Sequence, residues 1–599
     1  MSQFFKFLFA SCLGTVLALL LLFFIGAGWL TKMAGKATEE TMVSVEPNSV
    51  LQLNLENLIP EKTNNTPMPA FNLDQKKVLG LTDMVAAIRR AKDDPDIKGI
   101  YLNATFVMAG KATAATLRQA LLDFKTSGKF VVAYAHYYTQ GAYYLASAAD
   151  SVLLNPVGAV DFRGYSSQIA YYKGLLEKLD VDMQIFYVGK FKSATEPFRA
   201  DHMSDENRLQ VRQYLNALND ILVRDIAASR HITEVELRQV ANRFDGSSAE
   251  GALRNHLVDR LAHEDQAFLL IKNKIGLDAK DKLHRVSIED YFTAKGGPKT
   301  DFSVKDKIAI VYAEGTISDG DDSEPGDTYD GKYVKILREI RKNDNIKAIV
   351  LRVNSPGGSV LASENIFREV MLCKQAGKPV VVSMGDVAAS GGYYIACQAD
   401  SIFAEPGTIT GSIGVFGMIP MLDKTMKNKF GITYDTVRTG KFSAFGSPFV
   451  PFSEEEKAII QARINETYED FIQKVATGRH KTRDEINEIA QGRVWAGMKA
   501  KEIGLVDDMG GLDRALASAA KLANLEKYRT AEYPQAQTGL EQLIERFTKN
   551  KGKTDDDVKA WLVRTELGEM YPLYKTLQEA RKNQGTMIFA RMPWELTIR

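Results

Sequence analysis

Cysteine and histidine are scarce in this sequence. Its 599 residues include three cysteines, Cys12, Cys373 and Cys397, and seven histidines. Three irregularly spaced cysteines do not supply a disulfide framework or a zinc site, and the histidines do not show the H-E-x-x-H spacing of metalloproteases. We therefore expect neither a metal site nor a cofactor.

A surplus of charge of one sign is also missing. The 76 lysines and arginines nearly balance the 75 aspartates and glutamates, so the chain as a whole has no basic field that would attract phosphate groups. This balance disfavours nucleic acid as a partner. A chain of this length also exceeds what a single hydrophobic core supports, which predicts two or more domains.

Long apolar runs are missing except near the N-terminus, where Phe7 to Leu30 form 24 residues without a charge. A helix of this length crosses a hydrocarbon core of about 30 Å. A cleaved signal peptide is the alternative, but its apolar region is shorter and ends at a small-residue cleavage site. We expect an uncleaved membrane anchor. Lys6 precedes the run while Lys32 and Lys36 follow it, so the flanking charges do not decide its orientation.

The rest of the chain contains a tandem repeat. "PDIKGIYLN" from Pro95 aligns with "DNIKAIVLR" from Asp344, and "SGKFVVAYA" from Ser127 aligns with "AGKPVVVSM" from Ala376. The offset between the copies stays near 250 residues along the chain. Such collinear similarity at a fixed period indicates two copies of one structural unit.

Within each copy, short β-branched runs alternate with longer segments of helical periodicity. This alternation is typical of buried parallel strands joined by helices, and it predicts an α/β fold. We predict an N-terminal transmembrane anchor at residues 1–36, a first α/β repeat at 37–300, a second α/β repeat at 301–535 and a C-terminal helical extension at 536–599.

The two copies differ at one serine. "DVAASGGYYIACQAD" carries Ser390, whereas the matching segment "YYTQGAYYLASAAD" carries Gln140. Small residues and two following glycines suit a tight turn from a strand into a helix, which would present the hydroxyl group at the helix N-terminus. The alternative is that Ser390 is merely a small residue at a strand–helix junction.

A glycine pair is lost together with this serine. "VNSPGGSV" at the end of the preceding strand could direct backbone N–H groups toward an oxyanion, because glycine lets the backbone approach a reacting atom closely. The first copy has "TFVMA" at the matching position, without glycine. The joint loss favours a catalytic device that only the second copy retains.

A nucleophilic serine needs a base, and the sequence indicates a lysine from the other copy. "GKFKSATEPF" aligns with "GKFSAFGSPF", which pairs Lys190 with Lys441 and Lys192 with Ser443. Lys192 is therefore unique to the first copy, as Ser390 is unique to the second. A buried neutral lysine can act as a general base; the alternative is that Lys192 is one more solvated lysine.

The motifs "NSPGGSV", "AASGGYY", "GSIGV" and "GKFKS", in two tandem copies behind one apolar span, resemble the signal peptide peptidase A (protease IV) family in its long bacterial form. The resemblance extends to about residue 530 and implies a Clp protease/crotonase-like fold. It implies that Ser390 is the nucleophile, that Lys192 is the general base, and that the backbone N–H groups of Gly358 and Gly391 form the oxyanion hole. It also implies that Ser412, in "TGSIGV", hydrogen-bonds the base lysine.

The resemblance further implies a membrane-anchored peptidase that degrades remnant signal peptides and other apolar peptides. It implies a homotetramer, and a catalytic body in the periplasm behind a single pass through the bacterial inner membrane. Two other classes remain as alternatives. A crotonase-type acyl-CoA enzyme would share the fold but would not need an anchor, and a silent membrane scaffold would not need the intact Ser390 and Lys192.

Overall fold

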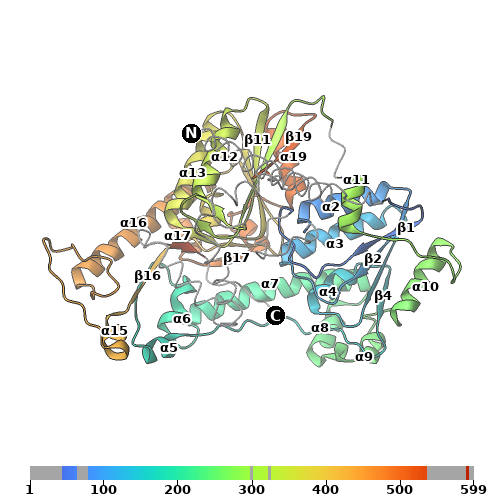
Figure 1. The fold of residues 1–599 in the computed structure, drawn as a ribbon, viewed down its shortest axis with the longest axis horizontal. Coiled ribbons are helices and arrows are strands. Elements are labelled where there is room, and N and C mark those ends of the chain that lie inside the picture. Colours follow the sequence, from blue (N-terminus) through green and yellow to red (C-terminus); the bar gives the residue numbers. More distant parts are fainter. Residues whose placement is uncertain (1–43, 64–77, 297–300, 322–325, 536–588, 592–599) are drawn as a thin grey trace, which may run out of the picture.

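A computed structural model of the chain describes residues 44–63, 78–296, 301–321, 326–535 and 589–591. Two sheets built mainly of parallel strands, one from each sequence copy, and a third, mixed sheet to which both copies contribute form the described part of the chain (Figure 1). The apolar run Phe7–Leu30 lies outside the described residues, so the anchor stays a prediction. Among the helices of the described ranges, none combines the length and hydropathy needed to span a membrane.

The first copy forms a parallel sheet in the order β6-β4-β3-β2-β1-β7. Alternate residues of its strands enter two apolar clusters, one against helices α2 and α3 and the other against α10, because successive side chains of a strand point to opposite faces. The strands are β1 (Ser49–Leu53), β2 (Ile97–Asn103), β3 (Phe130–Ala135), β4 (Ser151–Leu154), β6 (Arg260–Leu261) and β7 (Arg285–Ser287), and the helices are α2 (Leu81–Asp93), α3 (Lys111–Lys125), α4 (Gln140–Ala146), α5 (Lys173–Lys178), α6 (Glu196–Arg199), α7 (Asp205–Arg230), α8 (Glu234–Arg243), α9 (Ala249–Arg254), α10 (Glu264–Ile275) and α11 (Ile288–Lys295).

The second copy repeats this topology. Its strands β18, β14, β13, β11 and β8 follow one another in the order that β6, β4, β3, β2 and β1 have in the first copy. The sheet comprises β8 (Lys307–Glu314), β11 (Ile346–Ser355), β13 (Val380–Ala389), β14 (Ser401–Ala404), β15 (Ile409–Gly411), β17 (Val494–Ala496), β18 (Asp508–Met509) and β19 (Arg529–Tyr533), with helices α12 (Asp330–Lys342), α13 (Val360–Gln375), α14 (Gly391–Tyr394), α15 (Asp423–Phe430), α16 (Glu454–Arg479), α17 (Arg483–Ile489), α18 (Gly497–Glu502) and α19 (Leu512–Leu522). The predicted α/β fold in two tandem copies is confirmed.

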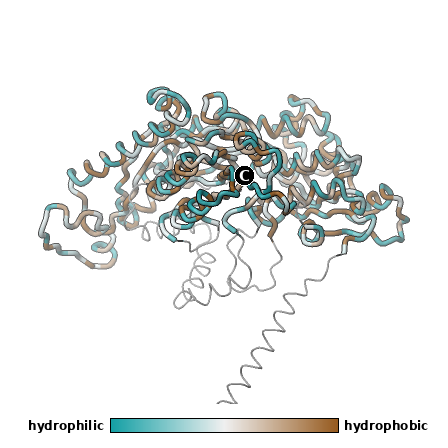
Figure 2. Tube along the Cα trace, turned by 90° about the horizontal axis from the view of Figure 1, so that it is seen from above, coloured by the Kyte–Doolittle hydropathy of each residue, from teal (hydrophilic) through white to brown (hydrophobic). Residues whose placement is uncertain are grey.

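Hydrophilic and hydrophobic residues alternate along most helices, as expected for helices that bury one face (Figure 2). The long helices α7 and α16 occupy matching places in the two copies. Each begins after a serine N-cap, Ser204 or Ser453, and each ends at a histidine with positive φ, His231 or His480. The two repeat-related histidines therefore terminate helices.

The mixed sheet joins the two copies. Its order is β10 (Thr328–Tyr329), β9 (Ile317–Ser318), β12 (Gly357–Ser359), β20 (Phe589–Arg591), β16 (Phe416–Met421) and β5 (Asp182–Tyr187). Strand β5 of the first copy pairs antiparallel with β16 of the second copy along its whole length. The chain that continues from β5 is therefore held against the second copy, and this chain carries Lys192.

Strand β20 departs from the sequence expectation. The sequence predicts a helical extension at residues 536–599, but Phe589–Arg591 pair as a strand with β12 and β16. The physical reason is that the free edges of two flanking strands offer backbone hydrogen bonds that a helix would not satisfy. The remaining residues of that extension lie outside the described part of the chain.

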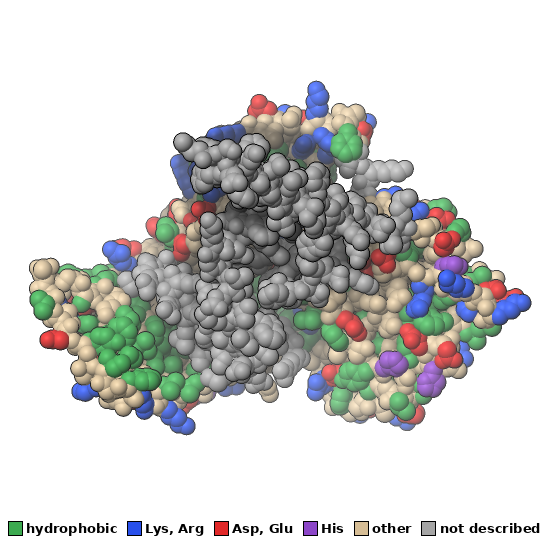
Figure 3. All heavy atoms as spheres, in the orientation of Figure 1, with side chains coloured by type: hydrophobic (Ala, Val, Ile, Leu, Met, Phe, Trp, Pro, Cys, Tyr) green, Lys and Arg blue, Asp and Glu red, His purple; other side chains and the backbone are tan. Residues whose placement is uncertain are grey.

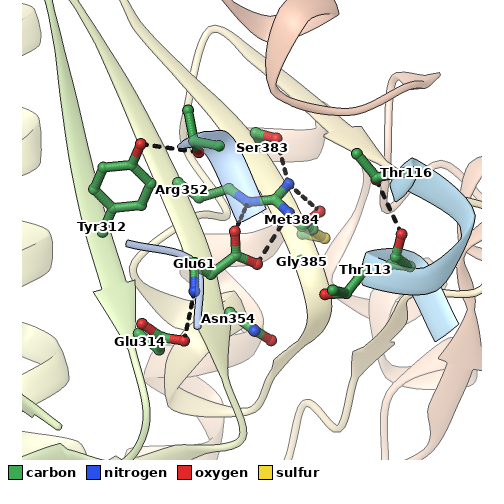
Figure 4. Close-up of polar contacts among 12 residues, drawn as sticks. Glu61, Thr113, Thr116, Tyr312, Glu314, Arg352, Asn354, Ser383, Met384 and Gly385 are labelled. Atoms are coloured by element: carbon green, nitrogen blue, oxygen red, sulfur yellow. Dashed lines mark hydrogen bonds and ion pairs between the residues drawn. The ribbon is translucent and has the colours of Figure 1, made fainter. Parts of the chain in front are cut away.

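A buried ion pair also locks the copies together. Glu61 precedes the first-copy helices and accepts hydrogen bonds from Arg352 of β11, at 2.9 Å from Nε and 3.0 Å from Nη2. Both side chains are 2% exposed. Arg352 also donates to Ser383 Oγ and to the carbonyl oxygen of Met384 on β13 (Figure 4). All three nitrogen atoms of the Arg352 guanidinium group donate, so the arginine ties the N-terminal segment of one copy to two strands of the other.

Candidate active site

Ser390 lies where β13 ends and α14 begins. Its backbone has φ 54° and ψ −116°, a conformation that non-glycine residues rarely adopt and that the surrounding structure must enforce. Two backbone hydrogen bonds hold the turn: Ser390 N–H donates to the carbonyl of Gly411 at 2.8 Å, and the Ser390 carbonyl accepts from Tyr394 N–H at 2.8 Å. The sharp strand-to-helix turn predicted from the sequence is confirmed.

Ser412 emerges beside Ser390 from the neighbouring strand. Ala389 of β13 and Gly411 of β15 are parallel partners, so the next residue of each strand is one of the two serines. Both serines have positive φ and both are fully buried. Parallel pairing thus brings the "AASGG" and "TGSIGV" motifs together.

The glycines of the site allow close contacts between loops. A Cβ atom on Gly392 would lie 2.7 Å from the carbonyl oxygen of Ser355, and a Cβ on Gly358 would lie 1.9 Å from the carbonyl oxygen of Ile317. The "NSPGG" segment therefore packs directly against the start of α14, where Gly391 is the first helical residue. A larger residue at Gly392 would push α14 away from the "NSPGG" segment, and a larger residue at Gly358 would push β12 away from β9.

Lys192 enters this site from the first copy. Its Nζ lies 3.0 Å from Ser390 Oγ, 3.0 Å from Ser412 Oγ and 3.2 Å from the Ser412 carbonyl oxygen. The side chain passes between two glycines: a Cβ on Gly492 would lie 2.6 Å from Lys192 Cβ, and a Cβ on Gly414 would lie 3.3 Å from Lys192 Cδ. The second glycine of "GSIGV" thus leaves room for the lysine.

Lys192 is almost completely buried. The side chain is 1% exposed, and burial lowers the pKa of its ammonium group well below the ordinary value of 10.5. Desolvation favours the uncharged form of an amine, because the charged form loses more hydration on burial. Burial therefore favours the neutral form of the amine that lies against the Ser390 hydroxyl group.

The lysine loop is held by a residue that the sequence motifs do not include. Gln210 of α7 donates to the carbonyl oxygen of Phe191 and to Ser193 Oγ, each at 3.0 Å, and its Oε1 accepts from Val494 N–H of β17 at 3.2 Å. One buried amide thus fastens both sides of Lys192 to a strand of the other copy. The sequence distinguishes Gln210 from its counterpart in the second copy, because the matching position of α16 is the apolar Ile459.

The first copy has no comparable site at the matching positions. Gln140, the counterpart of Ser390, accepts hydrogen bonds from the N–H groups of Arg163 and Gly164 and donates to the Gly164 carbonyl. Lys441, the lysine in the same copy as Ser390, lies at the surface and pairs with Glu455. The structure therefore brings Ser390 together with Lys192 and not with Lys441.

A serine on a strained strand–helix turn, an adjacent amine and close-packed glycine backbones are features of the serine hydrolases. Comparisons with known proteins identify the group. Residues 123–278 and 373–526 match peptidase family S49, and residues 304–406 match the Clp protease family. The chain belongs to peptidase family S49, and it is a serine protease.

Relatives from bacteria and plants cover most of the chain. It is 38% identical to Protease 4 of Salmonella typhi over 79% of this chain and 77% of that protein. It is 38% identical to Protease 4 of Haemophilus influenzae over 74% and 73% of the two chains. It is 31% identical to "Serine protease SPPA, chloroplastic" of Arabidopsis thaliana over 78% of this chain and 69% of that protein. The resemblance seen in the sequence is confirmed.

Proposed function

We propose that the protein is a membrane-anchored endopeptidase with a Ser/Lys dyad, which degrades remnant signal peptides and other apolar peptides after preprotein processing. The observation that carries the proposal is the 3.0 Å separation of Lys192 Nζ and Ser390 Oγ. A general base must lie within hydrogen-bond reach of the proton it removes. A base must also be unprotonated, and the burial of Lys192 favours this by lowering the pKa of its amine.

In the first step, the proton of Ser390 Oγ passes to Lys192 Nζ while Oγ bonds to the carbonyl carbon of the substrate. The carbonyl oxygen becomes an oxyanion, which accepts hydrogen bonds from the backbone N–H groups of Gly358 and Gly391. Loss of one such donor typically costs about 10²–10³ in rate. Ser412 Oγ orients the amine toward the reacting serine.

In the second step, the protonated Lys192 donates its proton to the departing amine, and the C–N bond breaks. This leaves an acyl-enzyme on Ser390 and a neutral Lys192. A water molecule then gives a proton to Lys192 and attacks the ester, and the same N–H groups again hold the oxyanion. Collapse of the second tetrahedral intermediate returns the proton to Ser390 and releases the acid product.

The proposal places the catalytic body in the periplasm, behind a single-pass anchor in the bacterial inner membrane. Its support is the uncharged run Phe7–Leu30 and the similarity to bacterial relatives, including a putative signal peptide peptidase SppA of Enterococcus faecium that is 35% identical over 39% of this chain and 69% of that protein. Large domains are translocated with little regard to flanking charge. An anchor would keep the protease where apolar membrane peptides accumulate.

The proposal also includes a homotetramer. Within the chain, β5 of the first copy pairs with β16 of the second. At an offset of 250 residues, their counterparts are residues 432–437 of the second copy and 166–171 of the first, and neither belongs to a strand. Each chain thus has two segments, the counterparts of the paired strands, that are not paired as strands within the described part of the chain, and we call them unused edges.

The unused edge of the second copy is apolar and exposed. We name Phe430, Ile432, Tyr434, Val437 and Phe442 the apolar arm, and these side chains are 67%, 44%, 45%, 98% and 40% exposed. Hydrophobic side chains gather over this end of the molecule, around α15 and α5 (Figure 3). Pairing of the apolar arm with the first copy of the next chain is a heterologous contact, which generates a ring when the rotation closes.

The test is labelling with a serine-directed acylating probe, followed by identification of the modified peptide. Modification of Ser390, together with cleavage of apolar peptides that is lost in Ser390→Ala, is the expected result. Hydrolysis of acyl-CoA thioesters without peptide cleavage would contradict the proposal, as would an unlabelled Ser390 in a folded protein.

A further inference from the structure

A cavity of about 640 Å³ is lined by helices α3 and α7 of the first copy, and residues 405–407 and 510–511 of the second copy contribute to its wall. Pockets for small ligands have volumes of about 300–1,000 Å³, so this cavity is large enough for one. Its apolar surface includes Val85, Val107, Ala114, Leu218 and Leu222. The cavity therefore suits a ligand with an apolar body.

The cavity adjoins the first-copy counterpart of the candidate active site. Val107, Ala109 and Gly141 line it. In the alignment of the two copies, Ala109 matches Gly358 and Gly141 matches Gly391, the two glycines that we assign to the oxyanion hole. The first copy has thus lost the reactive serine but keeps a cavity beside the place where the second copy would hold a substrate carbonyl group.

Lys111 supplies an amine to this cavity. It is the first residue of α3, it is mostly buried, and its Nζ lies 4.4 Å from the centre of the Tyr165 ring. Among the residues that the structure describes, none forms a hydrogen bond or an ion pair with this amine. Buried charges are normally paired, because an unpaired charge loses its hydration without compensation. Lys111 therefore offers a position for an anionic group of a ligand.

The Lys111 amine is mostly charged at neutral pH. Burial lowers the pKa of Lys111 to about 8, and the nearby carboxylate of Asp386 opposes this decrease. An amine with this pKa is largely protonated at about pH 7. Asp386 itself accepts hydrogen bonds from Thr113 N–H at 2.9 Å and from Thr113 Oγ1 at 2.6 Å. Both of its oxygen atoms are therefore bonded to Thr113 and not to Lys111.

The other acidic residues of the lining do not neutralise Lys111. Three aspartates form ion pairs with different cations: Asp123 with Lys92, Asp225 with Arg224 and Asp513 with Arg89. Burial raises the pKa of Glu405, which favours the neutral form of its carboxyl group. The positive charge of Lys111 thus faces an apolar cavity without a carboxylate bound to it.

We propose that this cavity binds a small apolar carboxylic acid, whose carboxylate pairs with Lys111 and whose apolar body contacts Val107, Leu218 and Leu222. Charge-assisted hydrogen bonds of this kind are among the strong ones in proteins. Two sources supply such acids: the C-terminal ends of apolar peptides released by proteolysis, and free fatty acids. The link to released peptides rests on the proposed function, whereas the binding itself does not.

The test is calorimetric titration of the full-length, detergent-solubilised Ser390→Ala protein, in which the candidate nucleophile is absent. The probes are N-acetyl-leucyl-leucine and its C-terminal amide, and hexanoate and hexanamide. We expect an acid to bind at least about ten-fold more tightly than its amide, because hydrogen bonds between charged groups contribute more than neutral ones. The acid with the larger preference over its amide identifies the source. Equal binding of acid and amide in both pairs would overturn the proposal.

Substitution of Lys111 tests the assigned cation. Lys111→Met removes the charge and keeps an unbranched side chain, so the preference for the acid should disappear, whereas Lys111→Arg should retain it. Lys125→Met is the matched control, because Lys125 is the last residue of the same helix and pairs with Asp150 outside the cavity. A Lys111→Met protein that still prefers the acid would overturn the proposal.

Filling the cavity tests the location of the bound probe. Ala115 lines the cavity from α3, so Ala115→Phe should place a ring in the space that the apolar body needs and weaken binding of the acid at least about ten-fold. Thermal melts check that the variant is folded. Undiminished binding to folded Ala115→Phe would place the acid elsewhere and would overturn the proposal.

Failure of this proposal and failure of the proposed function are distinguishable. Peptide cleavage by the wild-type protein that depends on Ser390, together with equal binding of acids and amides, contradicts the cavity proposal alone. Acid binding that requires Lys111, in a protein without cleavage that depends on Ser390, contradicts the proposed function alone.

Discussion

Lys192 Nζ and Ser390 Oγ lie 3.0 Å apart, although the two residues are 198 positions apart and belong to different copies of the repeat. The contact depends on the antiparallel pairing of β5 with β16. Neither copy contains both groups, so an active site of this kind exists only after the two copies have packed together.

The first prediction concerns the dyad. Lys192→Ala and Ser390→Ala should each lower kcat/KM for an apolar peptide by at least about 10³-fold, and the double variant should be no worse than either, because residues that act as a unit are strongly non-additive. Lys441→Ala is the control: its ion pair with Glu455 is exposed, and most activity should remain. A folded, fully active Lys192→Ala enzyme would refute the dyad.

The second prediction concerns pH. Burial lowers the pKa of Lys192, and the neutral amine is the base, so kcat/KM should rise as pH increases through that lowered pKa. At pH values between the lowered pKa and 10.5, the Lys192 amine is protonated in the unfolded chain and neutral in the folded protein. The free energy of unfolding therefore increases as pH rises through this window. Lys192→Met should remove this pH dependence and raise the melting temperature most at the acidic end, as measured by thermal melts across pH. Parallel pH–stability curves for the two proteins would argue against a neutral lysine.

The third prediction concerns Gly492, one of the two glycines between which the Lys192 side chain passes. Gly492→Ala places a Cβ 2.6 Å from Lys192 Cβ at a residue with φ 77°, so the lysine should be displaced and activity should fall by about 10²-fold, since small misplacements near the reacting atoms are costly. Gly446→Ala is the matched control, because Gly446 has φ 84° and no neighbour within 4 Å of the added atom. If the two variants lose activity to the same extent, the strain of an alanine at positive φ, and not the contact with Lys192, causes the loss.

The fourth prediction concerns the ion pair between the copies. Glu61→Ala leaves the Arg352 guanidinium buried without its carboxylate, which should lower the free energy of unfolding by about 3–5 kcal/mol. Replacing both residues with leucine should cost less, because neither charge of the pair remains buried. Chemical denaturation measures both values. If the double variant is less stable than Glu61→Ala, the two side chains stabilise the fold by more than neutralising each other's charge.

The fifth prediction concerns assembly. Val437→Asp, in the apolar arm, should convert the proposed tetramer to smaller species in light scattering of the detergent-solubilised protein, because a charge would be buried at the proposed contact. Val157→Asp is the control, since Val157 is 94% exposed and lies away from the arm. A monomeric wild-type protein would exclude the ring.

Comparison of the two sequence copies is sufficient to identify Ser390 and Lys192, because each is present in one copy and replaced in the other. The same comparison distinguishes Gln210, which matches Ile459, but a glutamine in a helix carries no chemical signature that draws attention to it. Gly492 escapes sequence reasoning for a different reason. Its importance lies in the absence of a side chain beside Lys192, and that neighbour is 300 positions away in the chain.

The sequence by itself determined the tandem α/β architecture and the residues with reactive groups, since strand and helix periodicity and the differences between the copies are local properties of the chain. Only the tertiary structure decided that Lys192 is 1% exposed and within reach of Ser390, that Glu61 neutralises Arg352, and that Phe589–Arg591 fill the gap between β12 and β16. The physical reason is that burial and strand pairing depend on which distant segments pack together. Backbone hydrogen bonds are available to any strand edge, so their partners follow from the folded arrangement and not from the letters of the strand.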